Sequence, residues 1–188
     1  MALTARDMSA RAKATIEDLY RASGKAEIVD GEIVLMSPTG AAPNDAAFEI
    51  TASLKAHARR TGKGRAVGDN AAFRVDLAHR QSFSPDAAYY VGPDPGMKFY
   101  EGAPVFAAEV RSDGDYGPAA ENAMARKRLD YFAAGTVVVW DVDLLSQEPV
   151  RVYRAVDPDR PSVYRRGAKA EAEPAVPGWT MPVDDLFR

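Results

Sequence analysis

The chain has 188 residues, a formal net charge of −3 and no cysteine. This length fits one domain with a full core, and the lack of cysteine excludes disulfides and thiolate metal sites. The acidic balance excludes a broadly basic nucleic-acid binder, so any DNA contact would need a local patch. Because no apolar run reaches the ~20 residues of a membrane-spanning helix, and the N-terminus is too charged for a signal peptide, we expect a cytoplasmic protein without membrane contact.

The first part of the chain predicts a helix followed by a β-hairpin. The helix is expected over residues 5–22, although Thr15 and Asp18 would also suit the capping of a shorter helix. The sequence EIVDGEIVLM (27–36) then predicts two strands that turn at Asp30-Gly31.

A second helix is predicted over residues 43–61, with Asn44 as its N-cap and Gly62 at its end. Four cations gather at that end, and they either complement the helix dipole or contact phosphates: Arg59, Arg60, Lys63 and Arg65. The sequence leaves both interpretations open.

The stretch from Ser84 to Trp140 contains two apolar strands that each carry one carboxylate, Asp86 and Glu109. A carboxylate in a buried strand must be paired, protonated or bound to a metal, because a bare buried charge is costly. The following helix presents Lys127 among small and apolar residues. If the two strands are neighbours, the carboxylates face one cavity beside an ammonium, an arrangement that suits a hard cation and a phosphate. On spacing alone, a buried salt-bridge network that also includes Arg111 fits equally well.

Pro85-Asp86, Glu109-Val110 and a lysine displaced onto the next helix resemble the motif of the PD-(D/E)xK nuclease superfamily. The order of segments along most of the chain further resembles the Uma-two family of restriction-endonuclease-like proteins: EIVDGEIVLMSPTG (27–40), SPDAAYYV (84–91), GAPVFAAEVRS (102–112), KRLDYFAAGTVVVWDVD (127–143), VRVYR (150–154) and PGWTMPVDDLF (177–187). The resemblance implies an α/β (α+β) fold, a single restriction-endonuclease-like domain with a mixed β-sheet flanked by helices and a nuclease-like core over about 26–154.

The resemblance also implies an endonuclease that hydrolyses phosphodiester bonds of nucleic acid, expected to be DNA. Its Mg²⁺, for which Mn²⁺ can substitute, would be held by Asp86, Glu109 and the backbone carbonyl of Val110. The metal would polarise a phosphoryl oxygen and lower the pKa of a bound water. Asp86, Glu109 and Lys127 would be the catalytic residues, with Lys127 orienting the water or stabilising charge on the phosphorus.

The motif departs from the superfamily pattern at its third position, where Arg111 replaces lysine. An arginine does not deprotonate at ordinary pH, so it could clamp a phosphate but would be a poor base. Glu49 on the second helix and Glu32 in the hairpin are candidate accessory carboxylates, and each also fits an ordinary solvated residue. These features keep two alternatives open: a catalytically inactive nuclease-fold binding or regulatory module, and a metal-dependent hydrolase acting on a smaller substrate.

The C-terminal region, residues 150–188, predicts a hairpin and a tail. The turn of the hairpin is expected at DPDRP (157–161), and residues 167–178 are expected to form a polar, mobile loop before Trp179 to Phe187 pack back. An exposed edge strand in the hairpin predicts self-association as a two-fold homodimer.

Overall fold

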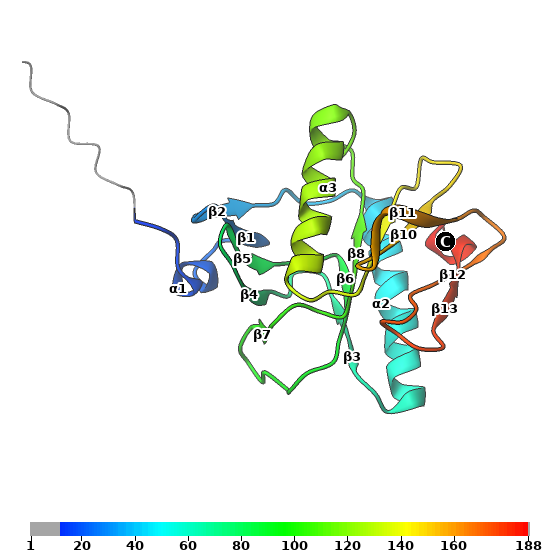
Figure 1. Cartoon of the computed structure of the whole chain (residues 1–188), viewed down its shortest axis with the longest axis horizontal. Helices are drawn as coiled ribbons and strands as arrows, with labels where there is room; N and C mark the ends of the chain where they lie inside the picture. Colours follow the sequence, from blue (N-terminus) through cyan, green and yellow to red (C-terminus); the bar gives the residue numbers. More distant parts are fainter. Residues whose placement is uncertain (1–11, 188) are drawn as a thin grey trace, which may run out of the picture.

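A central sheet of six strands organises the fold of residues 12–187, the part of the chain that the computed structural model describes (Figure 1). Its strands, given in spatial order, are β11 (Asp157–Tyr164), β10 (Val150–Arg154), β9 (Val138–Val142), β8 (Phe106–Val110), β6 (Ala87–Tyr90) and β3 (Arg65–Gly68). The runs FAAEV and VVWDV form the middle of this sheet, as their continuous apolar pattern predicts.

Two strand pairings in this sheet bring the predicted site residues together. β6 pairs with β8 in antiparallel register, with Ala87 opposite Ala108, so the strands that carry Asp86 and Glu109 are neighbours. β8 pairs with β9 in parallel, and Glu109 lies opposite Asp141. A parallel pair needs a crossover, which helix α3 (Pro118–Ala133) provides.

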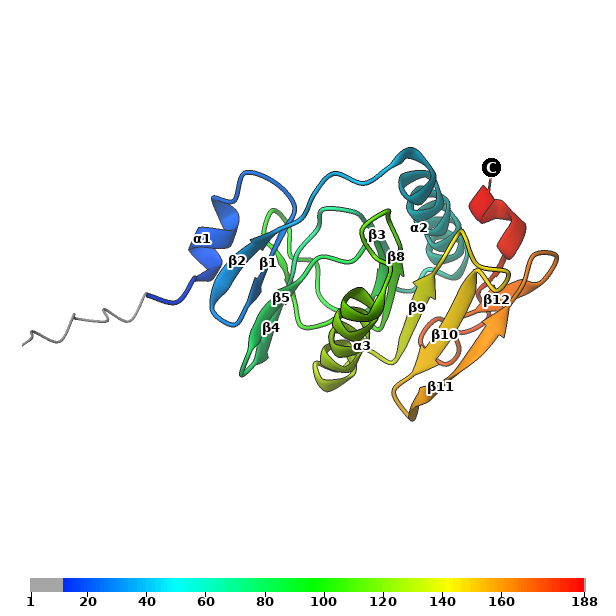
Figure 2. The same cartoon turned by 90° about the horizontal axis from the view of Figure 1, so that it is seen from above.

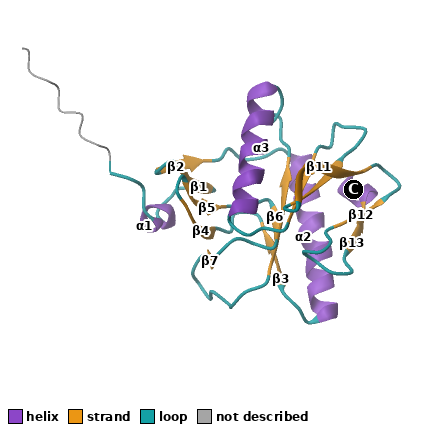
Figure 3. Cartoon of the chain, viewed as in Figure 1, coloured by secondary structure: helices purple, strands orange, loops and turns teal. Residues whose placement is uncertain are grey.

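The two long helices cover opposite faces of the six-stranded sheet (Figures 2 and 3). Helix α2 (Ala41–Thr61) packs Ile50 and Leu54 on the face that contains Phe106 and Ala108. Helix α3 packs Tyr131 on the other face, which contains Ala107 and Glu109 because strand residues alternate between faces. None of the helices within residues 12–187 is long and apolar enough to cross a membrane.

The boundaries of α2 differ from the prediction at its start. The helix begins at Ala41 with Gly40 as its N-cap, and the backbone N–H of Asn44 donates to the Gly40 carbonyl, so the prediction of Asn44 as N-cap is wrong. Its other end is as predicted, because Gly62 takes the left-handed conformation that ends many helices.

A second sheet lies beside the first, on the side of α3 (Figure 2). Its strands, in spatial order, are β2 (Glu32–Leu35), β1 (Ala26–Val29), β5 (Arg80–Phe83), β4 (Phe73–Leu77) and β7 (Tyr100–Glu101). The hairpin at Asp30-Gly31 is confirmed, and both turn residues have the positive φ of the tight turn that this dipeptide favours. Phe73 and Phe83 of this sheet share one core with Tyr131 of α3.

The N-terminal helix is shorter than residues 5–22. Helix α1 spans Ile16–Tyr20, and Thr15 and Asp18 form a reciprocal capping box, so the shorter alternative is correct. Residues 12–14 precede this helix without forming part of it, and the remainder of the prediction, over 5–11, lies outside the described residues.

The C-terminal region corrects two further predictions. The turn of the hairpin falls between β10 and β11 at Ala155-Val156, and the sequence DPDRP instead begins strand β11. The predicted mobile loop contains strand β12 (Lys169–Glu171), which pairs with β13 (Thr180–Pro182) ahead of the 3-10 helix η1 (Val183–Phe187). Trp179 stacks on Trp140 and donates its indole N–H to Ser53 of α2, which attaches this tail to the core.

Candidate active site

Glu109 is the central residue of the candidate site and lies near the end of β8, on the face that α3 covers. Lys127 Nζ of α3 lies 2.9 Å from Glu109 Oε2, and the Tyr131 hydroxyl donates to Glu109 Oε1 at 2.6 Å. Lys127 and Tyr131 are one helical turn apart, so α3 delivers both donors to one carboxylate. The carboxylate that interrupts the apolar strand is therefore fully paired.

The charges in this pair favour a protonated lysine. Burial alone would lower the pKa of Lys127, but the carboxylates of Glu109 and Glu27 outweigh burial and raise that pKa. Burial raises the pKa of Glu109, and the nearby Asp86 acts in the same direction against the opposing effect of Lys127. Burial also raises the pKa of the Tyr131 phenol, so this group stays a hydrogen-bond donor. Lys127 is thus a fixed cation and not a proton acceptor.

Glu27 of β1 is the second carboxylate that Lys127 contacts, at 3.0 Å, and it is 3% exposed. Its other oxygen accepts a hydrogen bond from Arg80 of β5 at 2.5 Å, and Arg80 in turn contacts Asp130 of α3 at 2.8 Å. The pKa of Glu27 is lowered, because Lys127 and Arg80 together outweigh the effect of burial. Glu27 therefore joins the second sheet to the helix that carries the lysine.

Asp86 lies just before β6 and is oriented by the main chain. Its Oδ2 accepts the backbone N–H of Val110 at 2.8 Å, while its Oδ1 lies 2.6 Å from Lys25 Nζ. Lys25 also contacts Asp69 Oδ1 at 2.5 Å. We name the set formed by Lys25, Glu27, Asp69, Asp86, Glu109 and Lys127 the acid–lysine cluster.

Within residues 12–187, no hydrogen bond or ion pair joins Arg111 to this cluster. Arg111 is 3% exposed, and its guanidinium donates to both oxygens of Asp141 at 2.8 Å and also to Glu121 in the first turn of α3. Because both partners are carboxylates of neighbouring elements, the arginine fixes α3 against β9. This placement leaves Arg111 poorly suited to clamp a phosphate.

The two accessory candidates lie outside the acid–lysine cluster. Glu49 belongs to α2, which covers the opposite face of the six-stranded sheet, and Glu32 is exposed on the edge strand β2. Among residues 12–187, neither side chain makes a hydrogen bond or ion pair with the cluster. The cations Arg59, Arg60, Lys63 and Arg65 gather where β3 begins, whereas Asp69 follows its other end, roughly 13 Å further along the strand.

Sequence reasoning did not assign a site role to Lys25, Glu27, Asp69 or Tyr131. Tyr131 had a usable signal, because its spacing of four from Lys127 places both on one helix face. Lys25 and Asp69 carried no such signal: the contact between Lys25 and Asp86 spans 61 positions, and only the assembled sheets create it.

The donor set of the acid–lysine cluster fits a hard divalent cation. It contains four carboxylates and two ammonium groups, while the charge of Arg80 is matched by Asp130. Two negative charges are therefore in excess, and all candidate donors are oxygens. No group of three His, Cys, Asp or Glu side chains within residues 12–187 is arranged to hold a metal. A metal here would thus be held by Asp86, Glu109, a main-chain carbonyl and water.

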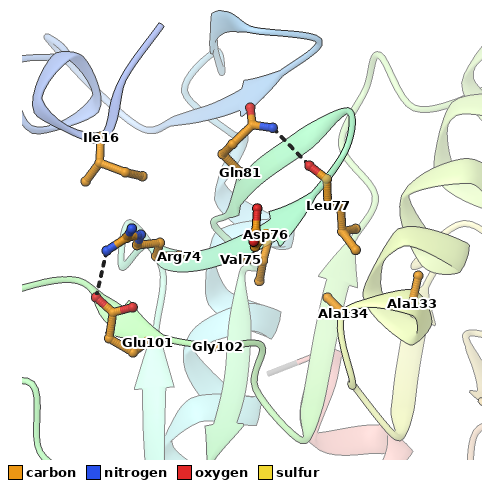
Figure 4. A pocket seen from close by; sticks show the side chains of 10 residues that line it. All are labelled: Ile16, Arg74, Val75, Asp76, Leu77, Gln81, Glu101, Gly102, Ala133 and Ala134. Atoms are coloured by element: carbon orange, nitrogen blue, oxygen red, sulfur yellow. Dashed lines mark hydrogen bonds and ion pairs between the residues drawn. The ribbon is translucent and has the colours of Figure 1, made fainter.

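A separate pocket of about 630 Å³ lies between β4, β7 and the end of α3 (Figure 4). Arg74 and Glu101 form an ion pair at 3.6 Å in its wall, and Asp76 and Gln81 also line it. None of its lining residues belongs to the acid–lysine cluster. The candidate site is therefore a group of charged side chains at strand ends, apart from this pocket.

The sheets, the crossover helix and the acid–lysine cluster place the chain among proteins of restriction-endonuclease-like fold. A crystal structure described as "a putative nuclease belonging to DUF820 from Anabaena variabilis ATCC 29413" is similar, with a TM-score of 0.71 and 17% sequence identity over 93% of this chain and 97% of that one. The chain belongs to the Uma2 family, described as "Putative restriction endonuclease", whose profile matches residues 14–184. No curated protein matches the chain.

Proposed function

We propose that this protein is a metal-dependent endonuclease that hydrolyses phosphodiester bonds in DNA. The observation that carries the proposal is the placement of Asp86 and Glu109 at neighbouring strand ends, with a protonated Lys127 on Glu109. The excess of negative charge in the acid–lysine cluster and membership of a family described in terms of restriction endonucleases support it.

Three residues of the cluster have a definable task in this reaction. Asp86, Glu109 and the Val110 carbonyl would hold Mg²⁺, with Mn²⁺ as a substitute, and the bound ion would act as a Lewis acid on a phosphoryl oxygen. Lys127 would donate to the oxygen that gains charge as the phosphodiester is attacked. Because its pKa is raised, Lys127 keeps this positive charge at neutral pH and does not act as the general base.

Two further side chains keep Glu109 and Lys127 in position. Tyr131 donates to Glu109 Oε1 and packs face to face against Phe83, with ring centroids 4.0 Å apart, so its hydroxyl is rigidly held. Arg111 fixes the first turn of α3 to β9 through Glu121 and Asp141. Fixed geometry matters here because a preorganised charge does not have to be reoriented during the reaction.

One observation favours a second function, that of a nuclease-fold binding module without catalysis. Lys25 and Lys127 already pair with Asp86 and Glu109, so the acids are partly neutralised by the chain itself. A cluster of this kind can persist as a structural salt-bridge network. Metal binding distinguishes the two functions without any assumption about the substrate.

The first experiment is calorimetric titration of Mg²⁺ and Mn²⁺ into the wild type and into Asp86→Asn, with Asp76→Asn as a control on the exposed side of β4. We expect saturable binding in the wild type and in the control, and its loss in Asp86→Asn. Absence of binding in the folded wild type would refute the metal-dependent function and would favour the second function, a nuclease-fold binding module without catalysis.

The second experiment is cleavage of supercoiled and linear DNA in the presence of Mg²⁺. Lys127→Met should lower the cleavage rate by about 10²–10³-fold, the usual effect of removing a donor to a developing negative charge. Lys55→Met, at an exposed position of α2, should leave the rate unchanged. Equal cleavage rates in the two variants would refute the proposed role of Lys127 in the reaction.

A further inference from the structure

The ammonium of Lys25 lies directly against the carboxylate of the candidate metal ligand Asp86. Lys25 immediately precedes β1, and its Nζ lies 2.6 Å from Asp86 Oδ1 and 2.5 Å from Asp69 Oδ1. The lysine side chain is 17% exposed, whereas the Asp69 side chain is 47% exposed. One cation of the chain therefore bridges a more buried carboxylate and a more exposed one.

The orientation of Asp86 makes this contact significant. Its Oδ2 is held by the backbone N–H of Val110 at 2.8 Å, which leaves Oδ1 as the oxygen directed at a cation. Lys25 covers that same oxygen. A divalent ion approaching Asp86 would meet an ammonium a few ångströms away, and such repulsion is strong even at the effective dielectric of a protein surface.

We infer that the Lys25 ammonium competes with a divalent cation for Asp86, and that Asp69 is the carboxylate that retains Lys25 when the cation binds. Lys25 and Asp69 thereby set the metal affinity of the site. This inference rests on the proposed function, because it takes Asp86 as a metal ligand.

Lys25 has the properties that a resident competitor needs. Its ammonium lies 2.6 Å from Asp86 Oδ1 and 2.5 Å from Asp69 Oδ1, so two carboxylates hold it as a cation. Its flexible four-carbon chain lets the ammonium shift between carboxylates without movement of the backbone. In the absence of metal, Lys25 reduces the repulsion between Asp69, Asp86 and Glu109, which keeps the cluster folded until a metal arrives.

The role of Asp69 follows from its position. It comes directly after β3, is more exposed than Asp86, and is the other carboxylate that contacts Lys25 among the described residues. When a divalent ion takes Asp86, the ammonium keeps a charge partner in Asp69 without entering bulk water. Removing Asp69 would leave Lys25 with Asp86 as its remaining contact and would strengthen the competition.

The test is a double-mutant cycle on metal affinity, measured by calorimetric titration of Mn²⁺ and Mg²⁺ into the full chain. Its variants are Lys25→Met, Asp69→Asn and the double variant, with Lys55→Met as a control for the loss of a lysine. We expect Lys25→Met to bind Mn²⁺ at least about tenfold more tightly, because the repelling charge is gone. We expect Asp69→Asn to bind more weakly than the wild type.

The double variant separates the proposed role from a general effect of charge. If Asp69 acts by holding Lys25, Asp69→Asn changes affinity little once Lys25 is already methionine. If Asp69 acts as a metal ligand or as a general source of negative potential, its loss weakens binding equally in both backgrounds. The second result would overturn the assigned role of Asp69.

The remaining outcomes separate this inference from the proposed function. Tighter binding to Lys25→Met than to the wild type supports the competition, whereas wild-type binding with an unchanged or weaker Lys25→Met overturns it and leaves the metal site intact. Absence of binding in all variants, Lys25→Met included, overturns the metal site and the inference with it. If Lys25→Met does not fold, the Asp69→Asn variant alone tests the competition. Binding of Mn²⁺ to Asp69→Asn as tight as or tighter than to the wild type would overturn it.

Discussion

Replacing Glu27 by glutamine should strongly destabilise the protein. The substitution keeps the shape of the side chain and removes its charge, so Lys127 and Arg80 lose a shared buried counter-charge. Breaking a buried ion pair by neutralising one partner costs about 3–5 kcal/mol, because the remaining charges stay desolvated. For a domain of this length, that loss lowers the melting temperature by roughly 6–20 °C. Glu32→Gln on the exposed neighbouring strand is the matched control and should change stability by less than about 0.5 kcal/mol.

The pH dependence of this difference tests its electrostatic origin. The pKa of Glu27 in the folded protein lies below its ordinary value of 4.5, so its stabilisation is fully present above that value and is lost as pH falls through the folded-state pKa. The gap between wild type and Glu27→Gln in urea unfolding should therefore be constant near neutral pH and shrink below pH 4.5. A Glu27→Gln cost below about 1 kcal/mol at pH 7 would refute the reasoning, because it would mean that the pair is not coupled to folding.

Three further predictions concern stability and assembly. Arg111→Met should cost about 3–5 kcal/mol in urea unfolding, because Asp141 is left buried and unpaired, whereas the exposed Arg126→Met should be neutral; equal costs would contradict this. Gly64→Ala should lower the melting temperature more than Gly62→Ala, because both glycines have positive φ but the added Cβ would collide with the Tyr89 ring only at Gly64. The exposed edge strand β11 predicts a homodimer, so light scattering should give twice the chain mass of 20.3 kDa, and a monomeric mass would exclude it.

The hairpin 27–36 shows where sequence reasoning reaches its limit. It contains the triplet EIV twice, and its register places Glu27 opposite Val34 and Glu32 opposite Val29, so both acids lie on one face of the hairpin. Only Glu27 meets Arg80 and Lys127, which come from β5 and α3. The local pattern predicted the strands and the turn, but the choice between two identical triplets depends on which part of the chain covers each one.

The strand carboxylates and the lysine were accessible from sequence for a different reason. A charge inside an apolar strand is costly wherever that strand lies, so Glu109 indicated a partner before any topology was known. The same logic placed Lys127 on the inner face of α3. The same argument did not identify the partner of Arg111. That partner, Asp141, is buried on a strand 30 positions later, and no local pattern in the sequence links the two residues.

The acid–lysine cluster also constrains the order in which the protein can become functional. The contact between Lys25 and Asp86 spans 61 positions of the sequence. The contact between Glu27 and its partner Arg80, which lies outside the cluster, spans 53. Contacts of such high sequence separation form only after the entropy of closing long loops has been overcome. A chain still being synthesised, or cut before α3, would leave Glu109 without its partners Lys127 and Tyr131. Such a chain cannot assemble the cluster, so premature or truncated products would lack the candidate site.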